Sequence, residues 1–148
     1  MPIKLQYLGI RYLAEPARLI LNYANEPFED CRYNQENWEP IKASSPYNTV
    51  PILTVDGEQI AQSMAIYHYL ARRFGLAGKG EIEIAKVEAI GEYFREMMNK
   101  ILPYLLFLIG KNPGGTKVVL VKTVKLLLKK IRSHIKHYVT KLKKFIQI

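Results

Sequence analysis

Two residue pairs in the chain offer groups that can bind a small peptide or an anion. Val50-Pro51 begins an apolar run, and a cis bond before this proline would expose the main-chain N–H and C=O of Val50 to a peptide-like ligand. The alternative is that Pro51 only begins a strand. Gln62-Ser63 stands before a helical segment, where the Ser63 hydroxyl is expected to cap the first turn and free N–H groups suit an anion.

The sequence does not favour a redox thiol pair, a metal site or a nucleotide-binding loop. Cys31 is the one cysteine of the sequence, which excludes a Cys-x-x-Cys redox centre and favours a reducing compartment. Gly110 and Gly115 have the spacing of a phosphate-binding loop, but Thr116-Lys117 is in the reversed order and a helical segment precedes it, so we reject that function. No metal is expected, because zinc-ligand spacing is lacking for His68, His134 and His137.

The elements that must position these residues follow from hydrophobic periodicity. Residues 1–76 predict the order βαβαββα with a four-stranded mixed sheet, which is a thioredoxin-like arrangement. Residues 77–80 form a linker and residues 81–148 have only helical patterns, so the fold class is α+β. Strands are expected at 3–8, 28–33, 50–55 and 59–61, and helices at 14–25, 38–43, 63–74, 82–108 and 118–146.

The net charge of +9 is unevenly distributed along the 148 residues. Residues 1–96 hold 10 basic and all 13 acidic side chains, whereas residues 97–148 hold 12 basic ones and no acid. This pattern argues against a uniformly basic nucleic-acid-binding domain. The lysine-rich segment 116–148 is expected to pack its apolar stripe on the preceding helix; an anionic membrane surface, nucleic acid or a partner protein are the less favoured alternatives.

The residues around the two pairs resemble the sigma-like class of cytosolic glutathione S-transferases, with its nematode, prostaglandin D synthase and S-crystallin relatives. The likeness covers residues 3–78 almost without gaps and continues more weakly to about residue 110. It implies a thioredoxin-like glutathione-binding domain followed by an all-helical domain, here shortened. The stretches that carry the resemblance are Lys4–Arg11, Ala14–Arg18, Phe28–Asp30, Val50–Gly57, Gln62–Ile66, Tyr69–Ala71 and Leu76–Gly78.

The resemblance also implies roles for single residues. Tyr7 alone would be assigned to core packing, but the family places here a tyrosine that donates its O–H to the glutathione sulfur and favours the reactive thiolate. Gln62 and Ser63 would hold the γ-glutamyl carboxylate, and the main chain of Val50, before Pro51, would pair with the cysteinyl part. The other implied contacts are Trp38 and Lys42 to the glycyl carboxylate and, across a dimer, Glu96 to the amine of the neighbour's glutathione.

The implied activity is conjugation of glutathione, as co-substrate, to hydrophobic electrophiles by a cytoplasmic homodimer, with Tyr104 near the electrophile. The start Met1–Lys4 is not expected to be a secretion signal, and no apolar segment has the length of a membrane span. Leu13 and Thr49 replace basic residues found in many relatives. With the shortened C-terminal part, these changes leave an alternative open: a catalytically weak or inactive protein that binds glutathione or other ligands.

Overall fold

The computed structural model describes residues 2–34 and 36–108, together with Lys129 and Ser133. Contacts within the chain divide it into two compact units, Met1–Gly91 and Glu92–Ile148. The boundary falls inside the long helix α4 (Glu81–Leu108), which continues through Pro103. The expected loop 110–116 and helix 118–146 lie outside the described residues.

The first unit is built on a four-stranded sheet in the order β2-β1-β3-β4. Its strands are β1 (Ile3–Leu8), β2 (Phe28–Tyr33), β3 (Ile52–Val55) and β4 (Glu58–Ala61). β1 and β2 are parallel, whereas the β1–β3 and β3–β4 pairs are antiparallel. The mixed sheet and the order of its elements are as predicted. β3 begins two residues later than expected, directly after Pro51, which has no N–H to give to the sheet.

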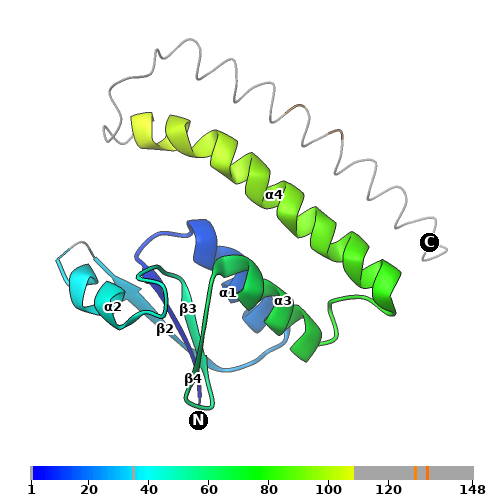
Figure 1. Cartoon of the computed structure of the whole chain (residues 1–148), viewed down its shortest axis with the longest axis horizontal. Helices are drawn as coiled ribbons and strands as arrows, with labels where there is room; N and C mark the ends of the chain where they lie inside the picture. The colour runs from blue at the N-terminus through cyan, green and yellow to red at the C-terminus, as the bar shows by residue number, and fades with distance from the viewer. Residues whose placement is uncertain (1, 35, 109–128, 130–132, 134–148) are drawn as a thin grey trace. The chain divides into compact units, whose positions relative to one another are not determined.

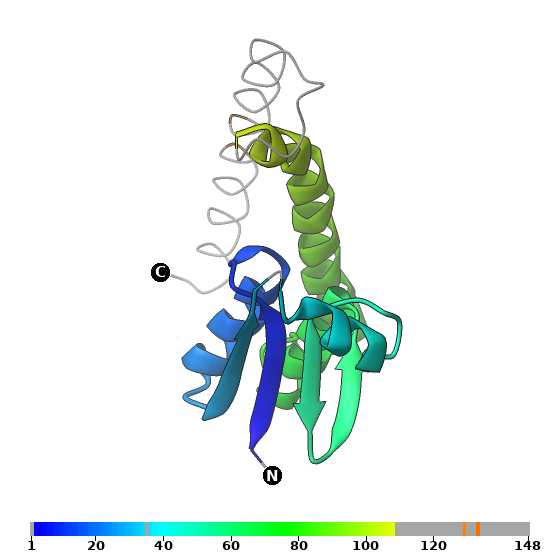
Figure 2. The same cartoon turned by 90° about the vertical axis from the view of Figure 1, so that its left-hand side faces the viewer.

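Helices cover both faces of the sheet, as Figure 1 shows with the strands seen nearly edge-on. α1 (Glu15–Tyr23) and α3 (Ser63–Arg73) lie on one face, and α2 (Trp38–Ser44) lies on the other. A single 3-10 turn, η1 (Tyr12–Ala14), connects the end of β1 to α1. Figure 2 shows the strands of this sheet from the face that α2 covers, with α2 in front of them. This is the thioredoxin-like arrangement that the sequence predicts.

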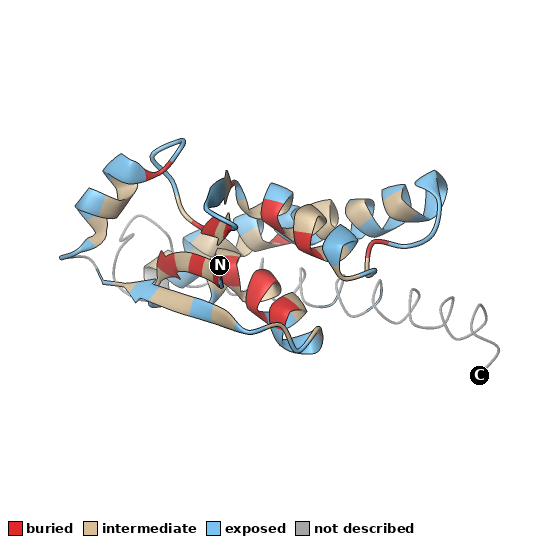
Figure 3. Ribbon diagram, turned by 90° about the horizontal axis from the view of Figure 1, so that it is seen from below, coloured by how far each residue is buried: buried red, intermediate tan, exposed pale blue. Residues whose placement is uncertain are grey.

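The core of the first unit lies between the sheet and the α1–α3 layer, where the buried residues are red in Figure 3. Alternate residues of β1 enter it because successive side chains of a strand point to opposite faces. The helices contribute side chains four positions apart, such as Ala17 and Leu21 of α1 or Ile66 and Leu70 of α3. Its buried members are Ile3, Leu5, Tyr7, Ala14, Ala17, Leu21, Leu53, Val55, Ile66 and Leu70.

A two-residue turn joins β3 to β4. Asp56 and Gly57 have φ angles of 52° and 90°, which is the conformation of the tight hairpin turn that the Asp-Gly sequence predicts. Val55 therefore pairs with Glu58 next to the turn, and Ile52 pairs with Ala61 at the far end. This register decides which residues meet at the end of the sheet where β3 begins.

Candidate functional site

The sheet register brings three predicted site segments to one end of the first unit. Gln6 pairs with Ile52, and Ile52 pairs with Ala61, so these residues form one row across β1, β3 and β4. The residue after Gln6 is Tyr7, those before Ile52 are Val50 and Pro51, and those after Ala61 are Gln62 and Ser63. All five predicted residues thus flank a single row of the sheet.

Tyr7 is almost fully enclosed, with 3% of its surface exposed. Burial raises the pKa of its phenol, while a hydrogen bond from the main chain of Leu13 and the nearby Arg18 cation lower it in part. The net shift is upward, so Tyr7 keeps its proton at neutral pH. Tyr7 is therefore an O–H donor, which is the state needed to stabilise an anion on an acceptor such as sulfur.

Pro51 and Val50 stand directly before β3. The Val50–Pro51 peptide bond is cis, and the Pro51 side chain is fully buried. Val50 is half-buried and packs against the core. The cis bond is the one that the sequence analysis considered for this position, and Pro51 stands before the strand and not inside it.

The Gln62-Ser63 pair forms the entrance to α3, but not in the way that the sequence predicts. The N-cap residue is Gln62, with φ of 71°, and no side chain makes a cap hydrogen bond. The predicted capping role of the Ser63 hydroxyl is therefore wrong, because Ser63 is already the first helical residue. The carbonyl of Gln62 accepts the N–H of Ile66. Gln62 is exposed and Ser63 half-buried, at a helix end whose free N–H groups favour an anion.

A second tyrosine belongs to this neighbourhood and was not anticipated from the sequence. The Tyr67 hydroxyl donates to the Leu13 carbonyl at 2.5 Å, which joins α3 to the η1 turn. Burial raises the pKa of Tyr67 to about 12, although a side-chain hydrogen bond from Ser63 opposes the shift. Helical spacing gives the signal that could have found it, because Ser63 and Tyr67 are four residues apart and share one face of α3.

Trp38 and Lys42 occupy one face of α2, again four residues apart, and both are half-buried. α2 lies on the opposite face of the sheet from α1 and α3. The strand register that brings the other five predicted residues together does not involve α2. The structure therefore places Trp38 and Lys42 beside each other but not in that row. Their roles stay predictions from the resemblance.

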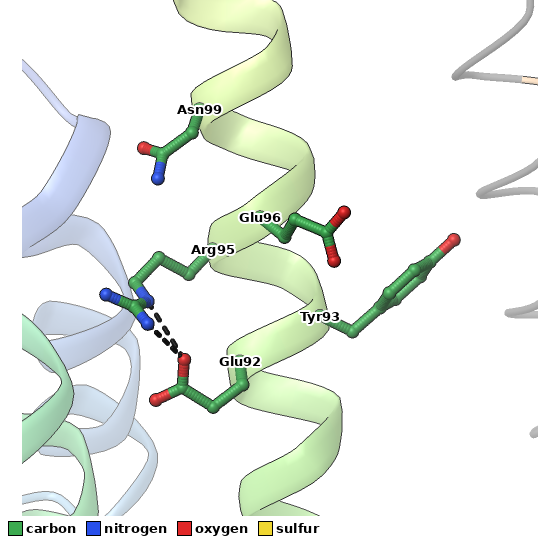
Figure 4. Close-up of a pocket in the computed structure, with 5 residues that line it drawn as sticks. All are labelled: Glu92, Tyr93, Arg95, Glu96 and Asn99. Atoms are coloured by element: carbon green, nitrogen blue, oxygen red, sulfur yellow. Dashed lines mark hydrogen bonds and ion pairs between the residues drawn. The ribbon is translucent and has the colours of Figure 1, made fainter.

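Glu96 lies in the second unit, on α4, where it is exposed and pairs with Lys100. Figure 4 shows its neighbours along the helix, including the Arg95 guanidinium hydrogen-bonded to Glu92. The side chains in this view line a pocket of about 410 Å³. The pocket residues are Glu92, Tyr93, Arg95, Glu96 and Asn99.

Arg18 is a structural residue of the first unit. Its side chain is 5% exposed, its Nε donates to both carboxylate oxygens of Asp30 at 3.1 Å, and its Nη1 pairs with Glu15 at 3.2 Å. Nη1 also donates to the carbonyl of Ile10 at 3.2 Å. The buried cation therefore joins α1, β2 and the segment that follows β1.

The described residues show neither a metal site nor a helix that could span a membrane. In that part of the chain, no three His, Cys, Asp or Glu side chains gather closely enough to hold a metal ion. None of the helices described there is long and apolar enough to cross a membrane. His134, His137 and the segment 110–117 lie outside it, as does nearly all of 116–148.

Comparisons with known proteins agree on one family. Residues 3–72 match the model described as the N-terminal domain of glutathione S-transferase. Glutathione S-transferase 1 of Ascaris suum is 45% identical over 117 residues, which are 79% of this chain and 57% of that protein. The crystal structure of the glutathione S-transferase from Ascaris lumbricoides has a TM-score of 0.84 at 39% identity, over 95% of this chain and 69% of that one. For monomeric Na-GST-3 from the hookworm Necator americanus the TM-score is 0.80 at 32% identity, over 97% and 68%. This chain spans little more than half the length of the curated relatives it matches.

Proposed function

The chain belongs to the glutathione S-transferase family, and on that basis we propose that it conjugates the thiolate of glutathione to hydrophobic electrophiles. The observation that carries the proposal is the row Gln6–Ile52–Ala61, which gathers a buried tyrosine, a cis-proline and a helix N-terminus at one end of the sheet. These groups match the three needs of the reaction: a donor to sulfur, a main-chain partner and an anion site.

Tyr7 would activate the thiol. Its phenol keeps its proton because burial raises its pKa, and the O–H can donate to the glutathione sulfur. A hydrogen bond that favours the anion over the neutral thiol lowers the thiol pKa. The thiolate then attacks the electrophilic carbon, the sulfur–carbon bond forms, and in a substitution the leaving group departs with its electron pair. The thiol proton passes to solvent.

The peptide itself would be held from several elements. Gln62 and Ser63 at the start of α3 are proposed to bind the γ-glutamyl carboxylate, supported by the exposed helix end. The main chain of Val50, next to the buried Pro51, would pair with the cysteinyl part. Trp38 and Lys42 on α2 would reach the glycyl carboxylate, and Tyr104 on α4 would lie near the electrophile.

We also propose a cytoplasmic homodimer, in which Glu96 of one copy approaches the glutathione amine of the other. Large apolar side chains exposed on α4, such as Ile82 and Ile90, support a covered helix face. Because one structural relative is described as monomeric, oligomeric state must be measured for this chain. The full chain is eluted from glutathione resin and then run on a sizing column. We expect it to elute from that column at twice the mass of one chain. Elution as a monomer contradicts the homodimer and the role of Glu96.

The activity is tested with a chlorinated aromatic electrophile and glutathione. We expect turnover by the full chain and a loss of about ten- to hundredfold in kcat/KM for Tyr7→Phe, because a hydrogen bond to a charged group is worth about 1.5–3 kcal/mol. Tyr23→Phe is the matched control, since Tyr23 on α1 is 75% exposed and away from the site row. Folded protein that binds glutathione without turnover, or equal rates for wild type and Tyr7→Phe, would overturn the proposal.

A further inference from the structure

Tyr67 lies between two parts of the proposed site, Ser63 at the start of α3 and Tyr7 at the end of β1. Its hydroxyl donates to the Leu13 carbonyl, and a side-chain hydrogen bond from Ser63 reaches it from the previous turn of α3. Leu13 in turn has a main-chain hydrogen bond to Tyr7. A continuous set of contacts therefore runs from Ser63 through Tyr67 and Leu13 to the Tyr7 hydroxyl.

We propose that Tyr67 is a positioning residue for thiol activation, acting through the main chain of Leu13 on the Tyr7 hydroxyl. This inference rests on the proposed function. The Leu13 peptide is held from both sides: its carbonyl accepts from Tyr67, and its main chain bonds to Tyr7. Fixing the carbonyl fixes the orientation of the same residue toward Tyr7, since the peptide groups on each side of one Cα are linked by only two soft dihedrals.

The effect on Tyr7 follows from hydrogen-bond polarity. When the Tyr7 oxygen accepts a hydrogen bond from Leu13, its own proton stays free to point at a ligand, and the bond it donates becomes stronger. Other charged or titratable groups that act on Tyr7 are Tyr12 and the Arg18 cation. Arg18 is fixed by Asp30 and Glu15, so it gives a constant field that Tyr67 does not control.

Tyr67 suits this role because it stays protonated at neutral pH and its ring packs, partly buried, against the core of the first unit. Its pKa of about 12 leaves the O–H intact at neutral pH, so there it orients Leu13 without exchanging protons. The ring lines a small apolar pocket of about 270 Å³ with Pro16 and Ile20 of α1 and Met64 of α3. Phenylalanine would keep that packing and remove only the hydroxyl, which makes Tyr67→Phe a clean variant.

The position also shows how a leucine at residue 13 fits the proposed activity. The contacts that Leu13 makes to Tyr7 and Tyr67 come from its main chain, which any residue except proline supplies in full. By resemblance, Leu13 stands where many relatives have a basic side chain. In the structure its peptide groups carry the connection instead.

The first test measures Tyr7 itself and does not depend on turnover. In ligand-free protein labelled at the tyrosine ring carbons, NMR titration gives the pKa of Tyr7. We expect this pKa to be higher in Tyr67→Phe than in wild type, because the main-chain hydrogen bond that lowers it is weakened. Tyr69→Phe is the matched control on the same helix, where the Tyr69 hydroxyl accepts from Arg73 at 2.9 Å. An unchanged Tyr7 pKa in Tyr67→Phe overturns the inference, even if the enzyme is active.

The second test follows the bound thiol. Ultraviolet absorbance of the thiolate is titrated for wild type, Tyr67→Phe and Tyr69→Phe with saturating glutathione. For Tyr67→Phe we expect a higher thiol pKa and a fall of about three- to tenfold in kcat near neutral pH, with the KM for glutathione within about twofold. A purely structural role would lower the melting temperature without moving either pKa. A loss confined to KM also refutes the positioning role, whereas a shifted Tyr7 pKa in a chain without turnover refutes the proposed function alone.

Discussion

The buried Arg18 guanidinium is stabilised by carboxylate partners. Asp30→Asn removes one of these carboxylates and should lower the free energy of unfolding of the first unit. The Arg18 side chain is 5% exposed and is held by Asp30 and Glu15. Its Nη2 is buried and finds no hydrogen-bond partner among the described residues. Asparagine keeps the shape of Asp30 and removes its charge, so the cation would stay buried with one carboxylate fewer.

The size of the effect follows from the exposure of each partner. Removing one member of a buried ion pair costs about 3–5 kcal/mol. The Asp30 side chain is 23% exposed, and Glu15 stays 3.2 Å from Nη1, so we expect a loss below that range, of about 2 kcal/mol. For a unit of this size that loss lowers the melting temperature by about 10 °C.

Fluorescence of Trp38, the single tryptophan of the sequence, can follow unfolding of the first unit because α2 belongs to it. The matched control is Glu29→Gln, one residue away on β2. Glu29 pairs with Lys4 at 3.5 Å between side chains that are 57% and 38% exposed, so its midpoint should equal that of wild type. If Asp30→Asn melted like wild type, or if the two variants lost equal stability, the reasoning from burial would be refuted.

Two further predictions concern the hairpin turn and alkaline pH. Gly57→Ala should lower the free energy of unfolding by about 1 kcal/mol, because Gly57 has φ of 90°. Gly9→Ala is the control: its new Cβ would meet only the Tyr33 carbonyl at 3.7 Å, so the urea midpoint should stay nearly unchanged. Equal midpoints for the two variants would contradict this prediction. Stability should fall between pH 10 and about 12, since folding raises the pKa of Tyr67 from 10.0 to about 12 and the unfolded chain releases its proton first. Urea titrations across that range check the slope, and Tyr67→Phe should flatten it; a wild-type stability that stays constant there would show that burial does not hold the proton.

Local patterns were sufficient to predict most of the first unit. Alternation in β1 and four-residue spacing in α1 and α3 mark the residues that enter the core, and the Asp-Gly turn fixes the hairpin. The limits of β1 and β2 are as predicted, whereas β4 begins one residue earlier than predicted, because alternation marks a strand but not its first residue. The start of β3 was placed too early because apolar composition alone does not show that Val50 precedes the ladder.

Contacts between distant segments were harder to predict. Tyr67 and Leu13 are 54 residues apart, and no pattern in the sequence shows that the carbonyl of one faces the hydroxyl of the other. Ser63 was assigned to a cap because its residue type favours that position, but a positive φ at Gln62 moves the helix start by one residue. Roles for Tyr7 and the other site residues came from the family resemblance, since an aromatic residue in a strand is by itself typical of a core.

The Asp56-Gly57 turn has a consequence for ligand choice, although it stands at the opposite end of the sheet from Gln62-Ser63. β4 is only four residues long, so the turn fixes how far Ser63 is displaced from Pro51 along the neighbouring strand. One residue added there would slide the entrance of α3 by about 3.3 Å and reverse which side chains face inward. The length of the turn therefore sets the distance between the proposed anion site and the proposed main-chain site.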